Sequence, residues 1–222
     1  MNNLIVVNHP LAQHLLTQLR NKQTPPEVFR SLTRKLTTIL LIEATRDLPT
    51  ENVLVETPLE QTQGTVLAAR LVVVPILRAG LGMLEPVVEL FPDVAVGYIG
   101  MERDHTTAVA NSYYLKLPPV EGSTVLLIDP MLATGGSADQ ALAAIRSRGA
   151  SKMVLICIVA APEGVERLAR HHPDVPIVTA ALDRELNPSK YILPGIGDFG
   201  DRLYGTLTSV DAPATMEAPL ND

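Results

Sequence analysis

The sequence predicts an α/β fold in which helices flank a mostly parallel sheet, and three observations lead to this prediction. Continuous apolar runs occur at Leu71–Leu77, Thr124–Ile128 and Met153–Ala161, as expected for strands that are buried on both faces. Each run is followed by a loop and then by a segment with helical periodicity. Strand, loop, helix and strand in this order predict right-handed βαβ units.

The N-terminal part of the chain predicts two helices. His9–Arg20 has the spacing of a short helix. Thr24-Pro25-Pro26-Glu27 has the form of a helix start, in which Thr24 is the N-cap and Glu27 completes a capping box. Apolar residues then recur at intervals of three and four, which predicts one buried face, and Pro49 marks the end of the helix. The residues of this face are Val28, Phe29, Leu32, Leu36, Ile39 and Leu40.

The middle of the chain predicts a weak strand, a helix and a ribbon. Val53–Glu60 alternates weakly and is interpreted as an edge strand, whereas Gly82–Leu90 is interpreted as a helix. Val94–Met101 and Ser112–Leu117 could pair as a β-ribbon on either side of a polar loop over Glu102–Asn111.

The C-terminal half continues the alternation of helices and strands and then loses it. Ser137–Arg148 is the clearest helix, with Ser137 and Gln140 as an expected capping box. Glu163–His171 predicts a further helix and Val175–Leu182 a further strand. Asp183–Thr206 is rich in Gly, Pro and Asp, and most of it predicts no regular element.

Composition limits the class of protein. The 222 residues carry a net charge of −6, which argues against a nonspecific nucleic-acid binder because such binding needs a dominant basic face. No apolar run approaches the roughly 20 residues of a membrane span. The one cysteine, Cys157, lies in an apolar run where a buried structural thiol is expected. We therefore expect a cytoplasmic protein without a nucleic-acid or membrane partner, with a single domain over residues 1–206 and a flexible tail over 207–222.

One loop carries the pattern of a phosphate-binding site. Asp129–Ser137 reads Asp-Pro-Met-Leu-Ala-Thr-Gly-Gly-Ser and joins a buried strand to a helix N-terminus. Its small residues would let backbone N–H groups approach an anion, and the helix N-terminus adds unpaired donors. Asp129 cannot bind phosphate, but it suits two neighbouring hydroxyls such as those of a ribose. The alternative interpretation is a βα turn in which the glycines serve only backbone geometry. The loop is not a Walker A loop, because no lysine follows its glycines.

Four segments, in this order, resemble the phosphoribosyltransferase family and especially its uracil-specific members. Val74–Met83 is similar to the pyrophosphate-binding loop of that family, and Arg103-Asp104, ahead of Tyr113-Tyr114, to its mobile arginine segment. Asp129–Ser137 is similar to the loop that binds 5-phosphoribosyl 1-diphosphate (PRPP). Tyr191–Thr206 is similar to the uracil-binding segment, and the resemblance as a whole covers residues 9–206.

The resemblance implies a fold, a reaction and partners. The fold is a Rossmann-like parallel-sheet phosphoribosyltransferase core with a β-ribbon arm and a C-terminal hood segment that binds the base. The reaction transfers the 5-phosphoribosyl group of PRPP to uracil and gives UMP and pyrophosphate, with Mg²⁺ carried by the PRPP. The resemblance further implies a homodimer or larger homo-oligomer, and it makes GTP a candidate allosteric effector.

The resemblance also implies roles for individual residues. Catalytic roles fall to Arg78, Arg103 and Asp198. The residues expected to bind PRPP are Arg78, Ala79, Gly80, Arg103, Asp129, Pro130, Met131, Leu132, Ala133, Thr134, Gly135, Gly136, Ser137 and Asp198. Those expected to bind uracil are Ile192, Gly197, Asp198 and Phe199, largely through main-chain atoms. No direct metal ligand is assigned, and Mg²⁺ is expected near Asp198.

The chemistry of the reaction agrees with these roles, and two alternative functions stay open. Displacing pyrophosphate builds positive charge on the ribose and frees a highly charged group, so positioning and leaving-group stabilisation matter more than a nucleophile. Phe199 stands where the family pattern has Ala, which raises the alternative of a transferase for another base. A PRPP- or nucleotide-sensing regulator on the same fold, binding RNA, is the other alternative, and the negative net charge counts against it.

Overall fold

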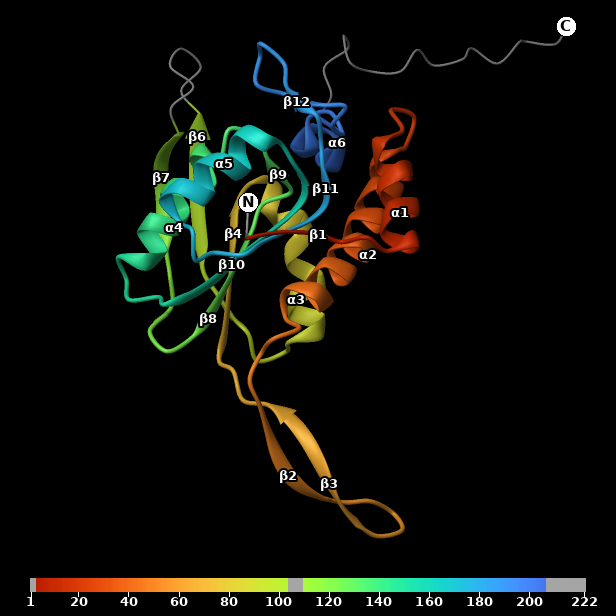
Figure 1. Cartoon of the computed structure of the whole chain (residues 1–222). Coiled ribbons are helices and arrows are strands. Elements are labelled where there is room, and N and C mark those ends of the chain that lie inside the picture. The colour runs from red at the N-terminus through yellow and green to blue at the C-terminus, as the bar shows by residue number, and fades with distance from the viewer. Residues whose placement is uncertain (1–2, 104–109, 207–222) are drawn as a thin grey trace, which may run out of the picture.

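A mostly parallel sheet forms the centre of the protein in its computed structural model, which describes residues 3–103 and 110–206 (Figure 1). In these residues the strand order is β1-β11-β10-β8-β4-β6-β7, with β5 beside β4 and β9 beside β10. Within this sheet all pairings are parallel except that of β6 with β7. The strands are β1 (Leu4–Val6), β4 (Leu71–Leu77), β5 (Ala95–Val96), β6 (Tyr98–Arg103), β7 (Ala110–Lys116), β8 (Thr124–Ile128), β9 (Met131–Leu132), β10 (Lys152–Ala160) and β11 (Ile177–Leu182). The predicted α/β class is confirmed.

Helices cover both faces of this sheet. The helices are α1 (Pro10–Arg20), α2 (Pro26–Ala44), the 3₁₀ helix η1 (Ala79–Met83), α3 (Leu84–Leu90), α4 (Gly136–Arg146), α5 (Pro162–His171) and α6 (Phe199–Tyr204). One apolar cluster joins α1, α2, α3 and α6 to the sheet, and a second joins α4 and α5 to the opposite face. Side chains of β4 divide between the clusters by alternation, with Val73 in the first and Val72 and Val74 in the second. This explains why the interior strands read as continuous apolar runs.

The N-caps of two helices are not the residues that the sequence predicted. The N-cap of α2 is Pro25 without a side-chain hydrogen bond, and the Thr24 hydroxyl donates instead to the Gln18 carbonyl at 2.6 Å. The N-cap of α4 is Gly135 at φ 76°, so the predicted capping box of Ser137 and Gln140 is wrong. A left-handed residue at this position favours glycine, because a Cβ is strained there.

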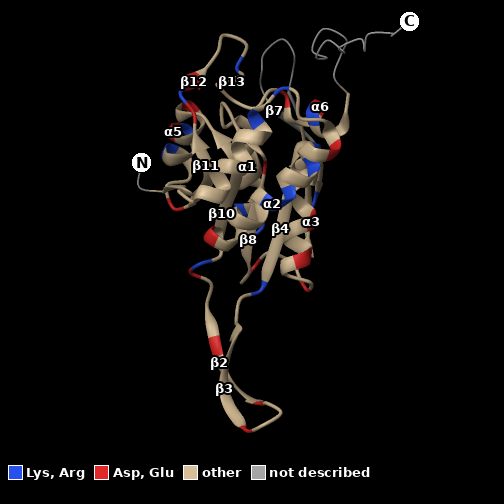
Figure 2. Cartoon of the chain, turned by 90° about the vertical axis from the view of Figure 1, so that its right-hand side faces the viewer, with Lys and Arg blue, Asp and Glu red and all other residues tan. Residues whose placement is uncertain are grey.

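A hairpin that the sequence only half predicted projects from the body of the protein (Figures 1 and 2). It consists of β2 (Thr50–Glu56) and β3 (Gln61–Leu67), which pair antiparallel from Thr50 with Leu67 to Glu56 with Gln61. Its acidic residues are Glu51, Glu56 and Glu60, and it contains no Lys or Arg. We call residues 50–67 the hairpin arm.

The segment after β11 contains three short elements where most of the sequence predicted none. These are β12 (Glu185–Leu186), β13 (Ile192–Leu193) and α6, and β12 pairs antiparallel with β13. The expected tail over 207–222 lies outside the described residues. Within the described part of the chain, no helix is both long and apolar enough to cross a membrane.

Candidate functional site

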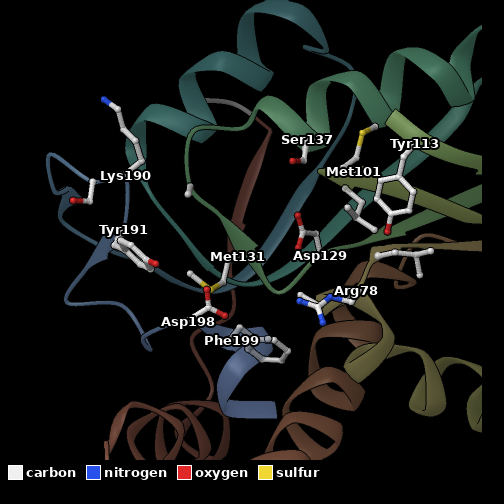
Figure 3. Close-up of a pocket in the computed structure, with 16 residues that line it drawn as sticks. Arg78, Met101, Tyr113, Asp129, Met131, Ser137, Lys190, Tyr191, Asp198 and Phe199 are labelled. Carbon is white, nitrogen blue, oxygen red and sulfur yellow. The ribbon is translucent and has the colours of Figure 1, made fainter. Parts of the chain in front are cut away.

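A pocket of about 840 Å³ opens at the carboxyl ends of the central strands. Its walls come from the end of β4 and the residues that follow it, from the ribbon of β6 and β7, from the loop after β8 and from the segment between β12 and α6. Figure 3 shows Arg78, Asp129 and Ser137 toward the side of Tyr113, with Asp198 and Tyr191 on the other side. Carboxyl ends of parallel strands are where ligands bind in open α/β sheets.

The loop Asp129–Ser137 is held in place by its own backbone. The carbonyls of Pro130 and Leu132 accept hydrogen bonds from Ile158 N at 2.9 Å and Ala161 N at 2.8 Å, which tie the loop to β10 and its end. Pro130 and Leu132 are buried and do not line the pocket, so their observed contacts are structural.

Other residues of this loop face the ligand space. Asp129, Met131, Ala133 and Ser137 line the pocket, and the loop ends at the N-terminus of α4. Thr134 Oγ1 accepts a hydrogen bond from Gly136 N at 3.4 Å, beside the left-handed Gly135. Unpaired amides at a helix N-terminus, together with the positive end of the helix dipole, attract an anion.

The predicted pyrophosphate loop follows β4 and turns into η1. Arg78 and Ala79 line the pocket, and the Arg78 guanidinium makes no hydrogen bond or ion pair with the residues that the structure describes. Gly80 is buried instead, and a Cβ there would lie only 2.6 Å from the Ile128 carbonyl oxygen. The missing side chain of Gly80 therefore lets the loop pack against the end of β8, beside Asp129.

The predicted arginine segment is only partly described. Arg103 ends β6, where its backbone pairs with Ala110, but its side chain and all of Asp104 lie outside the described residues. Two neighbours on the same ribbon, Met101 and Tyr113, line the pocket. The ribbon therefore borders the pocket, whereas the role expected of Arg103 stays a prediction.

The predicted uracil-binding residues fall into two groups. Asp198 and Phe199 line the pocket, whereas Ile192 is buried in β13 and Gly197, at φ 74°, forms the turn before α6. Asp198 is the N-cap of α6, and its Oδ1 accepts from Asp201 N at 3.0 Å. The Phe199 side chain is 1% exposed and packs edge-on against Phe29, with 5.2 Å between ring centroids. The ring therefore fills the core beneath the pocket rather than the ligand space.

Charged side chains that the sequence did not single out hold this segment. Arg20 contacts the Asp183 carboxylate at 2.6 and 2.9 Å and donates to the Gly195 carbonyl at 2.8 Å, while Asp183 accepts from Gly195 N at 2.9 Å. Arg202 is buried and donates to the carbonyls of Leu19, Ile196 and Asn21, and its guanidinium lies 4.4 Å from the Phe29 ring centroid. Burial lowers the pKa of Arg202. These contacts join the end of α1 to the segment between β13 and α6.

Several pocket residues had no assigned role in the sequence. Ile76, Leu77, Ser189 and Lys190 also line it. A short run of polar residues between two strands gives no signal of a site, which explains why Ser189 and Lys190 were missed. Tyr191 lay within the motif quoted for the base but was given no role.

Cys157 does not line the pocket. Burial raises the pKa of the Cys157 thiol to about 12, so the thiol stays protonated at neutral pH. Among the residues that the structure describes, no group of three or more His, Cys, Asp or Glu side chains could hold a metal ion alone. A metal that arrives with an anionic ligand would still find the carboxylates of Asp129 and Asp198 in the pocket.

Comparisons with known proteins show what this sequence is similar to. The model of a family described as uracil phosphoribosyltransferase matches residues 6–206. A protein of that name from Dictyoglomus turgidum is 50% identical over 205 residues, which are 91% of this chain and 99% of that protein. One from Bacillus pumilus is 49% identical over 208 residues, which are 93% and 100% of the two chains.

Solved structures extend the comparison to the fold. The AQ2163 protein from Aquifex aeolicus superposes with a TM-score of 0.87 at 37% identity, over 90% of this chain and 97% of that chain. A hypoxanthine-guanine phosphoribosyltransferase from Bacillus anthracis gives a TM-score of 0.50 at 11% identity, over 71% and 80% of the two chains. The second likeness concerns the fold alone.

Proposed function

The chain belongs to the uracil phosphoribosyltransferase family, and we propose that its pocket is where the 5-phosphoribosyl group of PRPP passes to uracil. The products are UMP and pyrophosphate. The observation that carries the proposal is that the phosphate-loop residues Asp129 and Ser137 line the same pocket as Asp198 and Phe199 of the base segment.

The loop Asp129–Ser137 is proposed to bind the phosphoribosyl part of PRPP. Amides of Thr134, Gly135, Gly136 and Ser137 would donate to the 5′-phosphate at the start of α4, and the carboxylate of Asp129 would accept from the ribose hydroxyls. Met131 and Ala133 complete this wall of the pocket.

Arginines are proposed to receive the diphosphate. The exposed Arg78 can direct two N–H groups at diphosphate oxygens, next to the backbone of Ala79. Arg103 is proposed to approach the same oxygens from the ribbon. Because the leaving group gains negative charge as the C1–O bond of PRPP breaks, such contacts strengthen toward the transition state.

The base is proposed to lie against the main chain near Gly197 and Asp198. Uracil carries no charge and alternates donors and acceptors, which backbone N–H and C=O groups can match. Because the Phe199 ring is buried against Phe29, it gives the alternative of a different base no support. The RNA-binding alternative likewise has no support, since the chain has a net charge of −6.

We also propose that Mg²⁺ enters with the diphosphate of PRPP and lies near Asp198. Mg²⁺ commonly combines one or two carboxylates with substrate phosphates and water, which suits a pocket that offers two separate aspartates. When bound, the ion would neutralise charge on the leaving diphosphate.

The test is an assay of the purified protein with uracil, PRPP and Mg²⁺. We expect UMP and pyrophosphate in equal amounts, and their absence over a broad range of conditions would exclude the activity. Asp129→Asn should raise the KM for PRPP about tenfold or more without unfolding the protein, because it weakens bonds to ligand hydroxyls. An unchanged KM would reject that role for Asp129.

A second copy of the chain is the proposed partner of the hairpin arm. Leu54, Leu59 and Leu67 are exposed on the arm, with Leu59 at 95%, and no part of the chain that the structure describes covers them (Figure 2). Exposed apolar side chains on such a projection favour association. Leu54→Asp should lower the association constant measured by sedimentation, whereas Ile42→Asp, at a similarly exposed site on α2, should not. A wild-type protein that is monomeric at micromolar concentration would contradict the proposal.

Activation by GTP and a cytoplasmic location stay predictions. Adding GTP to the assay at limiting PRPP tests the first, and cell fractionation tests the second.

A further inference from the structure

Arg167 of α5 lies beside the two glycines that begin α4. A Cβ added to Gly135 would be 3.4 Å from Arg167 Cδ, and one added to Gly136 would be 3.8 Å from Arg167 Nη1. The guanidinium therefore runs along the end of α4 that carries the phosphate loop, although no sequence motif pointed to this residue.

The approach of α5 to the loop is close and direct. A Cβ added to Gly164 would be 2.5 Å from the Ala133 carbonyl and 3.1 Å from that of Leu132, while one added to Gly135 would be 3.0 Å from the Gly164 carbonyl. The first turn of α5 thus lies in van der Waals contact with the loop. This contact fixes the distance between Arg167 and the N-terminus of α4.

Asp139 fixes the direction of the Arg167 side chain. Arg167 Nε donates to Asp139 Oδ2 at 2.8 Å, and the same carboxylate meets His171 Nδ1 and His172 Nε2, each at 3.0 Å. Burial raises the pKa of Asp139, but the hydrogen bonds from Arg167, His171 and His172 outweigh it and hold the pKa below its ordinary value. The two Nη groups of Arg167 make no hydrogen bond with the residues that the structure describes.

We propose that Arg167 is a further PRPP-binding residue, whose Nη groups add a positive charge to the amide cradle that receives the 5′-phosphate. The inference rests on the proposed function, because it assumes that the loop binds this phosphate. A phosphate monoester carries a charge of roughly −1.5 to −2 at neutral pH, whereas a helix N-terminus offers only about +0.5. Arg167 supplies the cation that the loop itself lacks, since Asp129–Ser137 contains no Lys or Arg.

The test distinguishes binding of the 5′-phosphate from binding of the diphosphate. Arg167→Gln should weaken binding of ribose 5-phosphate about tenfold, measured by calorimetry or as competitive inhibition against PRPP, because a charge-assisted hydrogen bond is lost. Binding of pyrophosphate, and the KM for uracil, should stay within about twofold. Arg167→Lys, which keeps the charge, should restore part of the affinity.

Arg146→Gln is the matched control. Arg146 is also held by an aspartate, Asp174, and its side chain is 40% exposed against 38% for Arg167, but it lies at the other end of α4. This variant should bind both ligands as the wild type does. If Arg167→Gln binds ribose 5-phosphate normally, or loses both ligands equally, the inference is overturned.

A measurement on the wild-type protein covers the case in which Arg167→Gln fails to fold. Phenylglyoxal modifies exposed guanidinium groups, and ribose 5-phosphate should slow modification of Arg167 but not of Arg146, as mapped by peptide mass spectrometry. Equal rates at Arg167 with and without ribose 5-phosphate would overturn the inference. The calorimetry and the phenylglyoxal experiment use no uracil, so failure of the uracil assay with normal ribose 5-phosphate binding would reject the proposed function alone.

Discussion

Two walls of the pocket are held in contrasting ways: the phosphate wall, formed by the loop Asp129–Ser137, and the base wall, formed by the segment Tyr191–Thr206. The phosphate loop is tied to β10 and α5 by main-chain hydrogen bonds and close glycine contacts. The base segment, Tyr191–Thr206, pairs through its main chain with the residues around β12. Its attachment to α1 and to the end of β11 depends on the charged side chains of Arg20, Asp183 and Arg202. Many sequences can preserve main-chain contacts, whereas a buried charge left without its partner is costly. At positions other than these glycines, the base wall should therefore be the more sensitive of the two to single substitutions.

The largest effect is expected at Asp183. Asp183→Ala would remove the carboxylate that binds Gly195 N and Arg20, and it would leave Arg20 with only its bond to the Gly195 carbonyl. We expect a loss of about 3–5 kcal/mol in the free energy of unfolding. The KM for uracil should rise more than the KM for PRPP. Urea unfolding and steady-state kinetics measure both effects.

The exposed pair of Arg34 with Glu85 is the control for Asp183. Glu85→Ala should cost at most about 1 kcal/mol, because surface ion pairs contribute little. If both variants lose the same stability, the contrast between the two walls does not hold.

A somewhat smaller effect is expected at Phe199. Phe199→Ala removes the ring from its contact with Phe29 and should cost about 3 kcal/mol in unfolding free energy through the cavity that it leaves. The ranking of bases as acceptors should not change, because the ring lies in the core. A panel of purines and pyrimidines measures this, and a new preferred base would show that the ring does shape the pocket.

The smallest of the three effects is expected at Asp139, on the phosphate wall. Asp139→Asn should lower the unfolding free energy at pH 7 by about 1–2 kcal/mol, since bonds to Arg167, His171 and His172 weaken. Because the pKa of Asp139 is lowered in the folded protein, its contribution is present above the ordinary value of about 3.9 and is lost as the pH falls through the folded pKa.

The pH profile sharpens this last comparison. The stability difference between wild type and Asp139→Asn should shrink below about pH 4. Asp174→Asn, which breaks the more exposed pair with Arg146, should give a smaller difference at every pH. A difference for Asp139→Asn that stays constant from pH 7 to pH 3 would contradict the role of the ionised carboxylate.

The same contrast explains which parts of the structure the sequence could predict. The bounds of β4 and β8 agree with the predicted runs Leu71–Leu77 and Thr124–Ile128, because strands buried on both faces contain little but apolar residues. The loop after β8 was located for a related reason, since its glycines and its place between strand and helix are local features. Local patterns therefore predicted the phosphate wall.

The base wall and the hairpin arm depend on information that is not local. Arg20 and Asp183 are 163 positions apart, and Arg202 reaches Leu19 over 183 positions, so neither contact leaves a pattern in a short window of sequence. Strand β3 was missed because the arm is exposed along most of both strands, and alternation appears only where one face is buried. The start of α4 was missed because a left-handed glycine, rather than a side-chain cap, begins it.

The burial of Cys157 has a practical consequence for experiments on this protein. Because the thiol is fully buried and burial raises its pKa to about 12, maleimides and mild oxidants should leave it intact. Cys157 is the one cysteine of the chain. A cysteine introduced in place of Leu59, at the tip of the arm, would therefore accept a fluorescent dye selectively and without prior removal of the native thiol.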